Sequence, residues 1–163
     1  MTQSAMRVGT KALKESLRAA PLAAKPVAAK KPRANSTEWT AGIAIGAAGA
    51  RRYRLYKPPG VRKTESLPLL VMLHGCGQDA EALAASSRMN TIAKRERFFV
   101  LYPEQDRLSN VQGCWNWYDT RTGRAQAEAH SINAAIEQVC VAQAVDRSRV
   151  ALAVEGQRPG QPG

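Results

Sequence analysis

The pattern of apolar and polar positions predicts two strands between residues 49 and 75. In residues 49–56, Tyr53 and Leu55 fall on one side and Arg52, Arg54 and Tyr56 on the other, which is typical of a half-exposed strand. Residues 69–73 are instead apolar without interruption and lead directly into a glycine turn. A short continuous run of this kind indicates a strand that is buried on both faces of a parallel sheet.

Two helices are predicted by apolar residues that recur every three or four positions. In residues 79–98, Asp79 is a candidate N-cap, and the shared face carries Leu83, Met89, Ile92 and Ala93. In residues 127–144, the shared face carries Ile132, Ile136, Val139 and Cys140. A short apolar strand is predicted at 98–103, and residues 145–154 are predicted to be a turn followed by another apolar strand. The order strand, strand, helix, strand, helix, strand favours an α/β fold with a largely parallel sheet.

The first 38 residues differ from the rest in composition and charge. Prolines at positions 21, 26 and 32 interrupt a stretch rich in alanine and lysine, which predicts a disordered, basic, low-complexity leader. Residues 1–63 hold 14 of the 24 Lys and Arg residues but 2 of the 13 Asp and Glu residues, and the whole chain has a net charge of +11. No aromatic residue stands among the basic ones before Trp39, so specific nucleic-acid binding is not expected.

Composition also bears on membranes, secretion and metals. The longest weakly polar stretch, residues 41–50, is too short and too rich in glycine for a membrane span, so no transmembrane segment is expected. The first 20 residues carry charges throughout and lack the apolar core of a signal peptide. The three cysteines show no CxxC spacing, and we expect neither a metal nor a cofactor.

The turn after the strand at 69–73 is the first candidate for chemistry. Ligands of open parallel sheets bind at the carboxyl ends of the strands, and here the sequence reads His74-Gly75-Cys76-Gly77. Such a turn is predicted to leave backbone N–H groups unpaired, and these can stabilise an oxyanion in acyl transfer. An ordinary glycine turn is the alternative interpretation. Residues 104–125, after the next strand, form a long polar loop that contains Cys-Trp-Asn-Trp at 114–117.

Three stretches together resemble a known family: LHGCGQD at 73–79, MNTIAKRERFFVLYPEQ at 89–105 and CWNW at 114–117. Over residues 51–153 the chain is similar to the polyhydroxybutyrate depolymerase-like esterases, which are α/β-hydrolases related to feruloyl and acetylxylan esterases. The resemblance implies ester hydrolysis by a serine nucleophile through an acyl-enzyme, with an ester or a polyester as substrate. It also implies that the backbone N–H of Cys76 forms part of the oxyanion hole, within a loop of His74, Gly75, Gly77 and Gln78. The family usually has threonine at position 77, and glycine there is expected to loosen the turn.

The resemblance also implies a nucleophile elbow, G-x-S-x-G, directly after Ala153. The chain reads Val154-Glu155-Gly156 instead, and no such motif occurs in its 163 residues. We therefore expect residues 39–153 to be the first half of a hydrolase domain, truncated before the elbow. Residues 154–163 would then be a non-homologous tail from a frameshift or truncation. The catalytic Ser, Asp and His would all be missing, so this chain is expected to be inactive.

Other nucleophiles and bases in the chain fit the chemistry less well. Ser86, Ser87 and Ser131 fall in predicted helices without the glycines of an elbow, and nothing pairs Cys76 with a base. His74 is expected to orient its loop, and His130 is expected to lie on a helix surface. The alternative function is a non-catalytic protein that binds a polyester or an anionic surface through its basic arm.

Three further questions stay open at this level. Trp115, Trp117 and Tyr118 either pack beneath their loop or line the ester site. Asn116 is expected to lie near the substrate together with the two tryptophans. Cys114 can pair with Cys76 only where the two loops meet. Relatives in the family are often extracellular, whereas the chain shows no signal peptide, so an extracellular and a cytoplasmic location both remain open. The particular ester and the oligomeric state are not predicted.

Overall fold

The computed structural model describes residues 38–62 and 64–156, which form eight helices and strands. The predicted leader, except its last residue, and residues 157–163 of the predicted tail lie outside these ranges. In chain order the elements are β1 (Trp39–Gly46), β2 (Gly49–Tyr56), β3 (Leu67–Leu73), α2 (Ala80–Ser87), α3 (Met89–Glu96), β4 (Phe99–Pro103), α4 (Arg124–Ala142) and β5 (Val145–Val154). All four predicted strands and both predicted helical regions are present.

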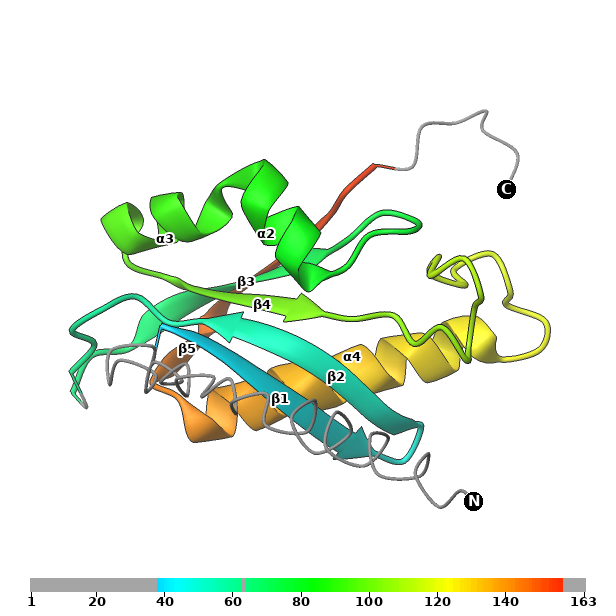
Figure 1. The fold of residues 1–163 in the computed structure, drawn as a ribbon. Helices are drawn as coiled ribbons and strands as arrows, with labels where there is room; N and C mark the ends of the chain where they lie inside the picture. Colours follow the sequence, from blue (N-terminus) through cyan, green and yellow to red (C-terminus); the bar gives the residue numbers. More distant parts are fainter. Residues whose placement is uncertain (1–37, 63, 157–163) are drawn as a thin grey trace, which may run out of the picture. The chain divides into compact units, whose positions relative to one another are not determined.

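The five strands form one mixed sheet in the order β1-β2-β4-β3-β5 (Figure 1). Strands β4, β3 and β5 are parallel to one another, while β1 and β2 add an antiparallel hairpin at one side. Helices α2 and α3 cover one face of the sheet, and α4 covers the other (Figure 1). The parallel part is therefore the part that follows the strand–helix alternation of the sequence.

Strand β1 was not predicted, because glycine and alanine hide its alternation. Gly42 lies opposite Tyr53 in the β1–β2 register, and a Cβ atom at position 42 would overlap the Tyr53 ring. Glycine is therefore required there for close packing rather than for a turn. Trp39, at the start of β1, packs edge-on against Tyr102 of β4 with 5.4 Å between ring centroids.

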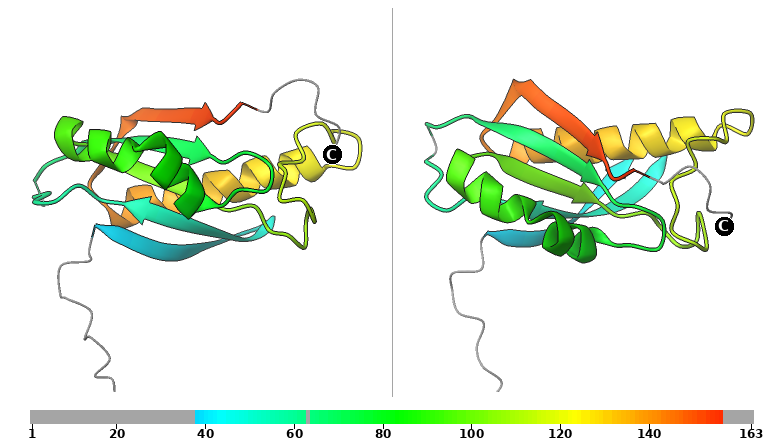
Figure 2. Two further views of the ribbon diagram at one scale, coloured as in Figure 1. Left: turned by 45° about the horizontal axis from the view of Figure 1, so that its top comes forward. Right: turned by 90° about the horizontal axis from the view of Figure 1, so that it is seen from above.

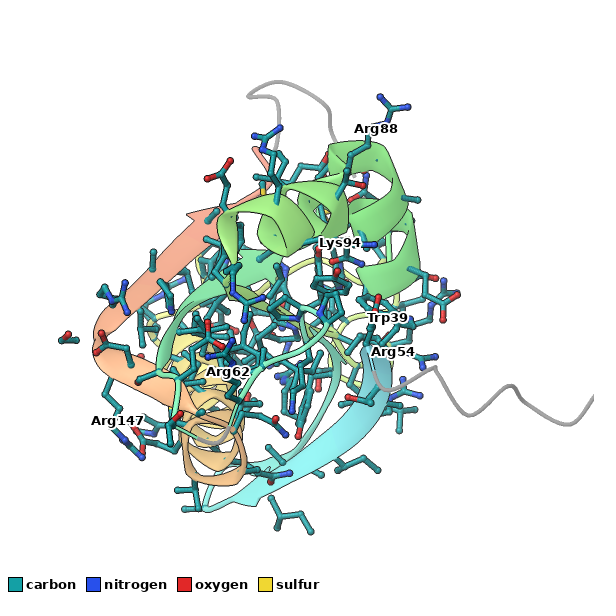
Figure 3. The ribbon with its side chains drawn as sticks, turned by 90° about the vertical axis from the view of Figure 1, so that its left-hand side faces the viewer. Trp39, Arg54, Arg62, Arg88, Lys94 and Arg147 are labelled. Atoms are coloured by element: carbon teal, nitrogen blue, oxygen red, sulfur yellow. A yellow bond between two sulfur atoms is a disulfide. The ribbon has the colours of Figure 1, made fainter. Side chains whose placement is uncertain are left out.

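The single helix predicted for residues 79–98 is two helices in the structure. Asp79 caps α2 as expected, because its Oδ1 accepts a hydrogen bond from the Ala82 N–H at 2.8 Å. Arg88 then adopts the left-handed conformation, with φ at 54°, and this interrupts the helical hydrogen bonds before α3 begins. The Arg88 side chain points outward from this junction (Figure 3). Leu83 and Ala93 are buried all the same, so the apolar face predicted across the junction is largely kept.

Alternation along the central strands divides the core between the two faces of the sheet. Phe99 and Leu101 belong to the cluster on the α4 side, whereas Val100 and Tyr102 belong to the cluster beneath α2 and α3. Ile132 and Val139 complete the α4 side, with Ile136 and Cys140 packed partly against them. Burial of both faces of β3 and β4 agrees with the uninterrupted apolar runs.

Strand β5 lies at the edge of the sheet and pairs with β3 alone (Figure 2). Val150, Leu152 and Val154 lie opposite the inward-facing side chains of β3, yet they are 38%, 56% and 50% exposed. An exposed, apolar, unpaired edge favours association with other chains. No helix within the described residues is long and apolar enough to cross a membrane.

Candidate functional site

The carboxyl ends of the three parallel strands bring together the segments that the sequence singled out. The loop that begins at His74 follows β3, the loop 104–123 follows β4, and Glu155 and Gly156 follow β5. In parallel sheets such ends lie at the same edge, which is where ligands bind.

A disulfide bond joins the first two of these loops. Cys76 and Cys114 are bonded with their Cα atoms 4.3 Å apart, which answers the pairing question that the sequence left open. The Gly77 N–H also donates to the Gln112 carbonyl oxygen at 2.9 Å, two residues before Cys114. The turn after β3 and the Cys-Trp-Asn-Trp loop are therefore fixed to each other by a covalent bond and a hydrogen bond.

The backbone N–H groups of the turn are more fully used than the sequence predicts. The Gly75 N–H donates to Oε1 of Gln78 at 3.2 Å, and the Gln78 N–H donates to the Gly75 carbonyl oxygen at 3.2 Å. With the Gly77 contact, three N–H groups of the loop have partners, so the expectation of unpaired donors is wrong for these three. The role of the Cys76 N–H stays a prediction. Gly77 has φ at 74°, a conformation that glycine adopts at little cost.

His74 is buried and uses both ring nitrogens within the loops. Its Nδ1 donates to the Gly75 carbonyl oxygen at 2.9 Å, and its Nε2 accepts a hydrogen bond from the Gln105 N–H at 3.1 Å. Because an N–H group can only donate, Nε2 must be the acceptor and the proton must lie on Nδ1. The His74 carbonyl oxygen accepts the indole N–H of Trp115 at 2.8 Å. In this arrangement neither ring nitrogen is available as a general base.

Behind His74 lies a network of buried polar side chains that the sequence analysis missed. Gln105 is its centre: the side-chain oxygen accepts from Arg51 at 2.7 Å, and the side-chain nitrogen donates to Glu128 and to the Cys114 carbonyl oxygen. Arg51, Gln105 and Glu128 are 5%, 5% and 4% exposed. Burial lowers the pKa of Arg51, and the negative charges of Glu128 and Asp106 oppose this shift.

Glu128 also holds the tryptophan loop. Its two carboxylate oxygens accept the Asn116 N–H at 2.7 Å and the Asn116 side-chain amide at 2.8 Å. Signals for both charged residues exist in the sequence. Arg51 stands two residues before Tyr53, at an inward-facing position of the strand, and Glu128 stands four residues before Ile132, on the buried face of α4. A charge at an apolar position of either pattern marks a buried polar site.

The two tryptophans differ in burial: one packs beneath the loop, and the other is partly exposed beside it. Trp115 is 3% exposed and belongs to the core, with the Arg51 guanidinium 5.3 Å from its ring centroid. Trp117 stacks on Trp115 with 5.7 Å between ring centroids, yet it is 39% exposed. Trp115 therefore packs beneath the loop, whereas Trp117 is partly exposed and lines a cavity at the site. Asn116 is buried and serves the Glu128 contacts.

The serines considered as substitute nucleophiles are engaged in helical hydrogen bonds. Ser86 and Ser87 both donate to the Leu83 carbonyl oxygen, at 3.2 and 2.7 Å. Ser131 donates to the Glu128 carbonyl oxygen at 2.8 Å and accepts from Arg51 at 3.0 Å. His130 is exposed on α4. Within residues 38–62 and 64–156, no serine is hydrogen-bonded to a histidine, and no cluster of three metal-ligating side chains occurs.

Glu155 belongs to the predicted tail and reaches this site together with its neighbours Val154 and Gly156. Its N–H donates to the Leu73 carbonyl oxygen at 2.9 Å, so the pairing with β3 continues one residue beyond β5. Its carboxylate lies near Gly75, and one carboxylate oxygen, Oε2, is buried without a hydrogen-bond partner in the described part of the chain. A cavity of about 120 Å³ beside it is lined by His74, Trp115, Trp117, Val154, Glu155 and Gly156.

The mixed sheet, the glycine turn after β3 and the disulfide-linked loop after β4 define an α/β-hydrolase-type fold. Solved structures with this fold include an esterase from Pyrobaculum calidifontis and the carboxylesterase EstE1, cloned from a metagenomic library. Their sequences are 19% and 18% identical to this chain, with a TM-score of 0.50 for each. Each match covers 73% of this chain, and 35% and 37% of the two esterases respectively. These likenesses confirm the predicted fold class.

The family follows from a direct sequence match. The profile of the family described as "Esterase PHB depolymerase" matches residues 51–160, and the chain belongs to this family of carboxylic-ester hydrolases. The poly(3-hydroxyalkanoate) depolymerase C of Paucimonas lemoignei is 37% identical over 84 residues, which is 51% of this chain. The chain spans about a fifth of the length of that relative, since the match covers 20% of it.

Proposed function

We propose that this chain carries the ester-binding loops of a carboxylic-ester hydrolase and that the 163-residue chain does not itself hydrolyse esters. The observation that carries the proposal is the contrast at the carboxyl ends of the strands. The loops of the family are held there by a disulfide and a buried network. Ser86, Ser87, Ser131 and His74, in contrast, are engaged in structural hydrogen bonds.

In this proposal the Cys76 N–H donates to the carbonyl oxygen of the ester. An oxyanion donor of this kind acts through a fixed position, because it then needs no reorganisation as charge develops. The disulfide, the Gly75–Gln78 hydrogen bonds and His74 supply that rigidity. Attack on the carbonyl carbon needs a deprotonated nucleophile and a base within hydrogen-bond reach. His74 supplies no base because both of its ring nitrogens are engaged.

The neighbouring cavities offer room for the two sides of an ester. A largely apolar cavity of about 230 Å³ is lined by Met72, Leu83, Ser86, Ser87, Ala153, Val154 and Glu155. It adjoins the smaller cavity beside Trp117, because Val154 and Glu155 line both. Apolar walls with few polar groups are typical of small-molecule sites.

The test is hydrolysis of p-nitrophenyl acetate and p-nitrophenyl butyrate by the purified full chain. We expect the folded protein to release p-nitrophenol no faster than the same protein after heat denaturation. Saturable release that is lost on denaturation would contradict the proposal. Thermal unfolding of the same sample shows that the folded state was assayed.

A second candidate function, non-catalytic binding to a polyester surface, is favoured by the exposed apolar side chains of the loop 104–123. Leu108, Val111 and Tyr118 are 94%, 87% and 75% exposed, and they lie on the same loop as Trp117. Single apolar residues on a surface are common, but three on one loop beside the site are suited to contact with an apolar polymer.

Adsorption to polyhydroxybutyrate particles tests this second candidate. Replacing Leu108, Val111 and Tyr118 together by serine should abolish adsorption, whereas Val141→Ser, a change at an equally exposed apolar residue of α4, should leave it intact. Adsorption through the basic residues of the predicted leader would instead weaken as salt concentration rises. Equal adsorption of the triple variant and the native chain would show that the loop 104–123 does not bind the polyester.

A further inference from the structure

Among the described residues at the site, the Glu155 carboxylate has a buried oxygen atom that accepts no hydrogen bond. Its Oε2 is buried and has no hydrogen-bond partner in residues 38–62 and 64–156. Buried polar atoms are almost always paired, because an unpaired one forfeits its hydration without compensation. The backbone of Glu155 is meanwhile fixed by its hydrogen bond to Leu73. The backbone of Glu155 is thus fixed, while Oε2 of its carboxylate has no donor among the described residues.

The space beside this carboxylate has the chemistry of a cation site. The cavity of about 120 Å³ is lined by the stacked indoles of Trp115 and Trp117, by Val154 and by Glu155. Indole faces attract cations more strongly than other aromatic side chains do, and they do so best where water is partly excluded. An apolar cavity of about 150 Å³ accommodates benzene, so this volume suits a small ligand group rather than a polymer.

Arg51, which lies against Trp115, does not satisfy Glu155. Arg51 lies 5.3 Å from the Trp115 centroid, but its guanidinium donates to Ser131, Gln105 and the Glu104 carbonyl oxygen. The negative charges of Glu128 and Asp106 act on Arg51 and offset its charge. The ring nitrogens of His74 are both engaged. The half-exposed face of Trp117 is therefore the aromatic surface left for a ligand.

We propose that this cavity binds a small organic ammonium group, of the methylated or quaternary class. The Glu155 carboxylate balances the positive charge, and the Trp117 indole contacts the methyl groups. A quaternary ammonium donates no conventional hydrogen bond, so charge and the aromatic face, rather than directed donors, select it. A cation of this class differs chemically from an ester, so the ligand is not the one considered under the proposed function. The inference does not depend on ester binding.

Choline and its neutral carbon isostere, 3,3-dimethylbutan-1-ol, provide a matched pair of probes for the native chain. Both fill the same volume, and only choline carries the charge. We expect choline and tetramethylammonium to change the tryptophan fluorescence with dissociation constants in the millimolar range, and the isostere to bind at least about tenfold more weakly. Equal binding of the isostere, or no saturable response to either cation, would overturn the proposal.

The variant Glu155→Gln separates charge from shape. It keeps the size of the side chain and should weaken choline binding about tenfold, to the level of the isostere. Glu96→Gln, which removes an exposed carboxylate on α3, should leave choline binding unchanged. Unchanged choline binding by a folded Glu155→Gln protein would contradict the assignment. The comparison of choline with its isostere uses the native chain and so holds even where the variant fails to fold. Ester turnover in the separate hydrolysis assay would contradict the proposed function and leave this result standing.

Discussion

The backbone N–H of Gln105 donates to Nε2 of His74 over 3.1 Å, and this contact ties the end of β4 to the end of β3. The side chain of the same glutamine joins Arg51 to Glu128 by accepting from the first and donating to the second. One buried amide therefore couples the β2 strand and the α4 helix to the loop that carries Cys76. The Gln105 amide hydrogen-bonds to the positive Arg51 and to the negative Glu128. Removing it therefore leaves each of these two side chains without that partner.

Replacing Gln105 by leucine should destabilise the protein by about 2–4 kcal/mol. A buried donor or acceptor that loses its partner costs about 1–3 kcal/mol, and here Arg51 and Glu128 both lose one. The measurement is the free energy of unfolding from chemical denaturation. Gln126→Leu, at an exposed position of the same helix as Glu128, is the control and should change this free energy by less than about 0.5 kcal/mol. Equal effects of the two changes would show that the network contributes nothing.

The Cys76–Cys114 disulfide should contribute about 4 kcal/mol to stability. It closes a loop of 38 residues, and a cross-link of this length removes that much chain entropy from the unfolded state. The double variant Cys76→Ser/Cys114→Ser should unfold at correspondingly lower denaturant concentration. Cys140→Ala, at the thiol that forms no disulfide, should have a much smaller effect. A double variant as stable as the native chain would contradict this role.

The elements that sequence predicted well are those whose side-chain pattern is set by burial alone. Residues 69–73 are apolar without interruption because both faces of β3 are covered, and the face of Ile132 and Val139 follows from packing on the sheet. Strand β1 was missed because its pattern depends on Tyr53, whose ring requires glycine at position 42. The break at Arg88 was missed because a left-handed residue has no signature in helical spacing.

The parts of the site that consist of short sequence motifs were predicted. The parts that depend on contacts between residues far apart in the sequence were missed. The turn at His74 and the loop of Trp115 stand out as glycine-rich or aromatic motifs. Arg51 and Glu128 stand out only as charges at apolar positions, and the contacts that give them a role form when β2 and α4 enclose Gln105. Glu155 was assigned to a tail, and only the pairing of its N–H with Leu73 brings it to the site.

The exposed apolar edge at β5 should make the protein self-associate. Val150, Leu152 and Val154 present an unpaired, partly exposed strand, and a lysine on such an edge prevents pairing with another chain. Leu152→Lys should therefore increase the soluble fraction and the monomer fraction in sedimentation velocity. Val141→Lys introduces the same charge on α4 and should do neither. An equal gain in both variants would mean that net charge, and not the edge, controls solubility.

The Glu65–Arg97 pair should make stability depend on pH in the acidic range. The Arg97 guanidinium donates to both carboxylate oxygens of Glu65, at 2.6 to 2.9 Å, and this hydrogen bonding lowers the pKa of Glu65 below its ordinary value of 4.5. The unfolded chain therefore takes up the proton first as pH falls. The stabilisation is complete above about pH 4.5 and is lost as pH falls through the lower pKa of the folded state.

Thermal unfolding of the native chain and of Glu65→Gln between neutral and acidic pH measures this contribution. We expect the native chain to be more stable at neutral pH and the two melting temperatures to converge on acidification. Glu96→Gln, whose carboxylate pairs with its exposed neighbour Arg95, serves as the control. A difference between native and Glu65→Gln proteins that stays constant across this pH range would contradict the assignment.

Labelling with a fluorophosphonate tests the central claim most directly, because this reagent forms a covalent bond with an activated serine whatever the preferred ester. The full chain is incubated with the reagent, and its intact mass is measured before and after. We predict an unchanged mass, since Ser86, Ser87 and Ser131 are engaged in structural hydrogen bonds without a histidine partner. A stoichiometric adduct on any serine of the folded chain would contradict the account.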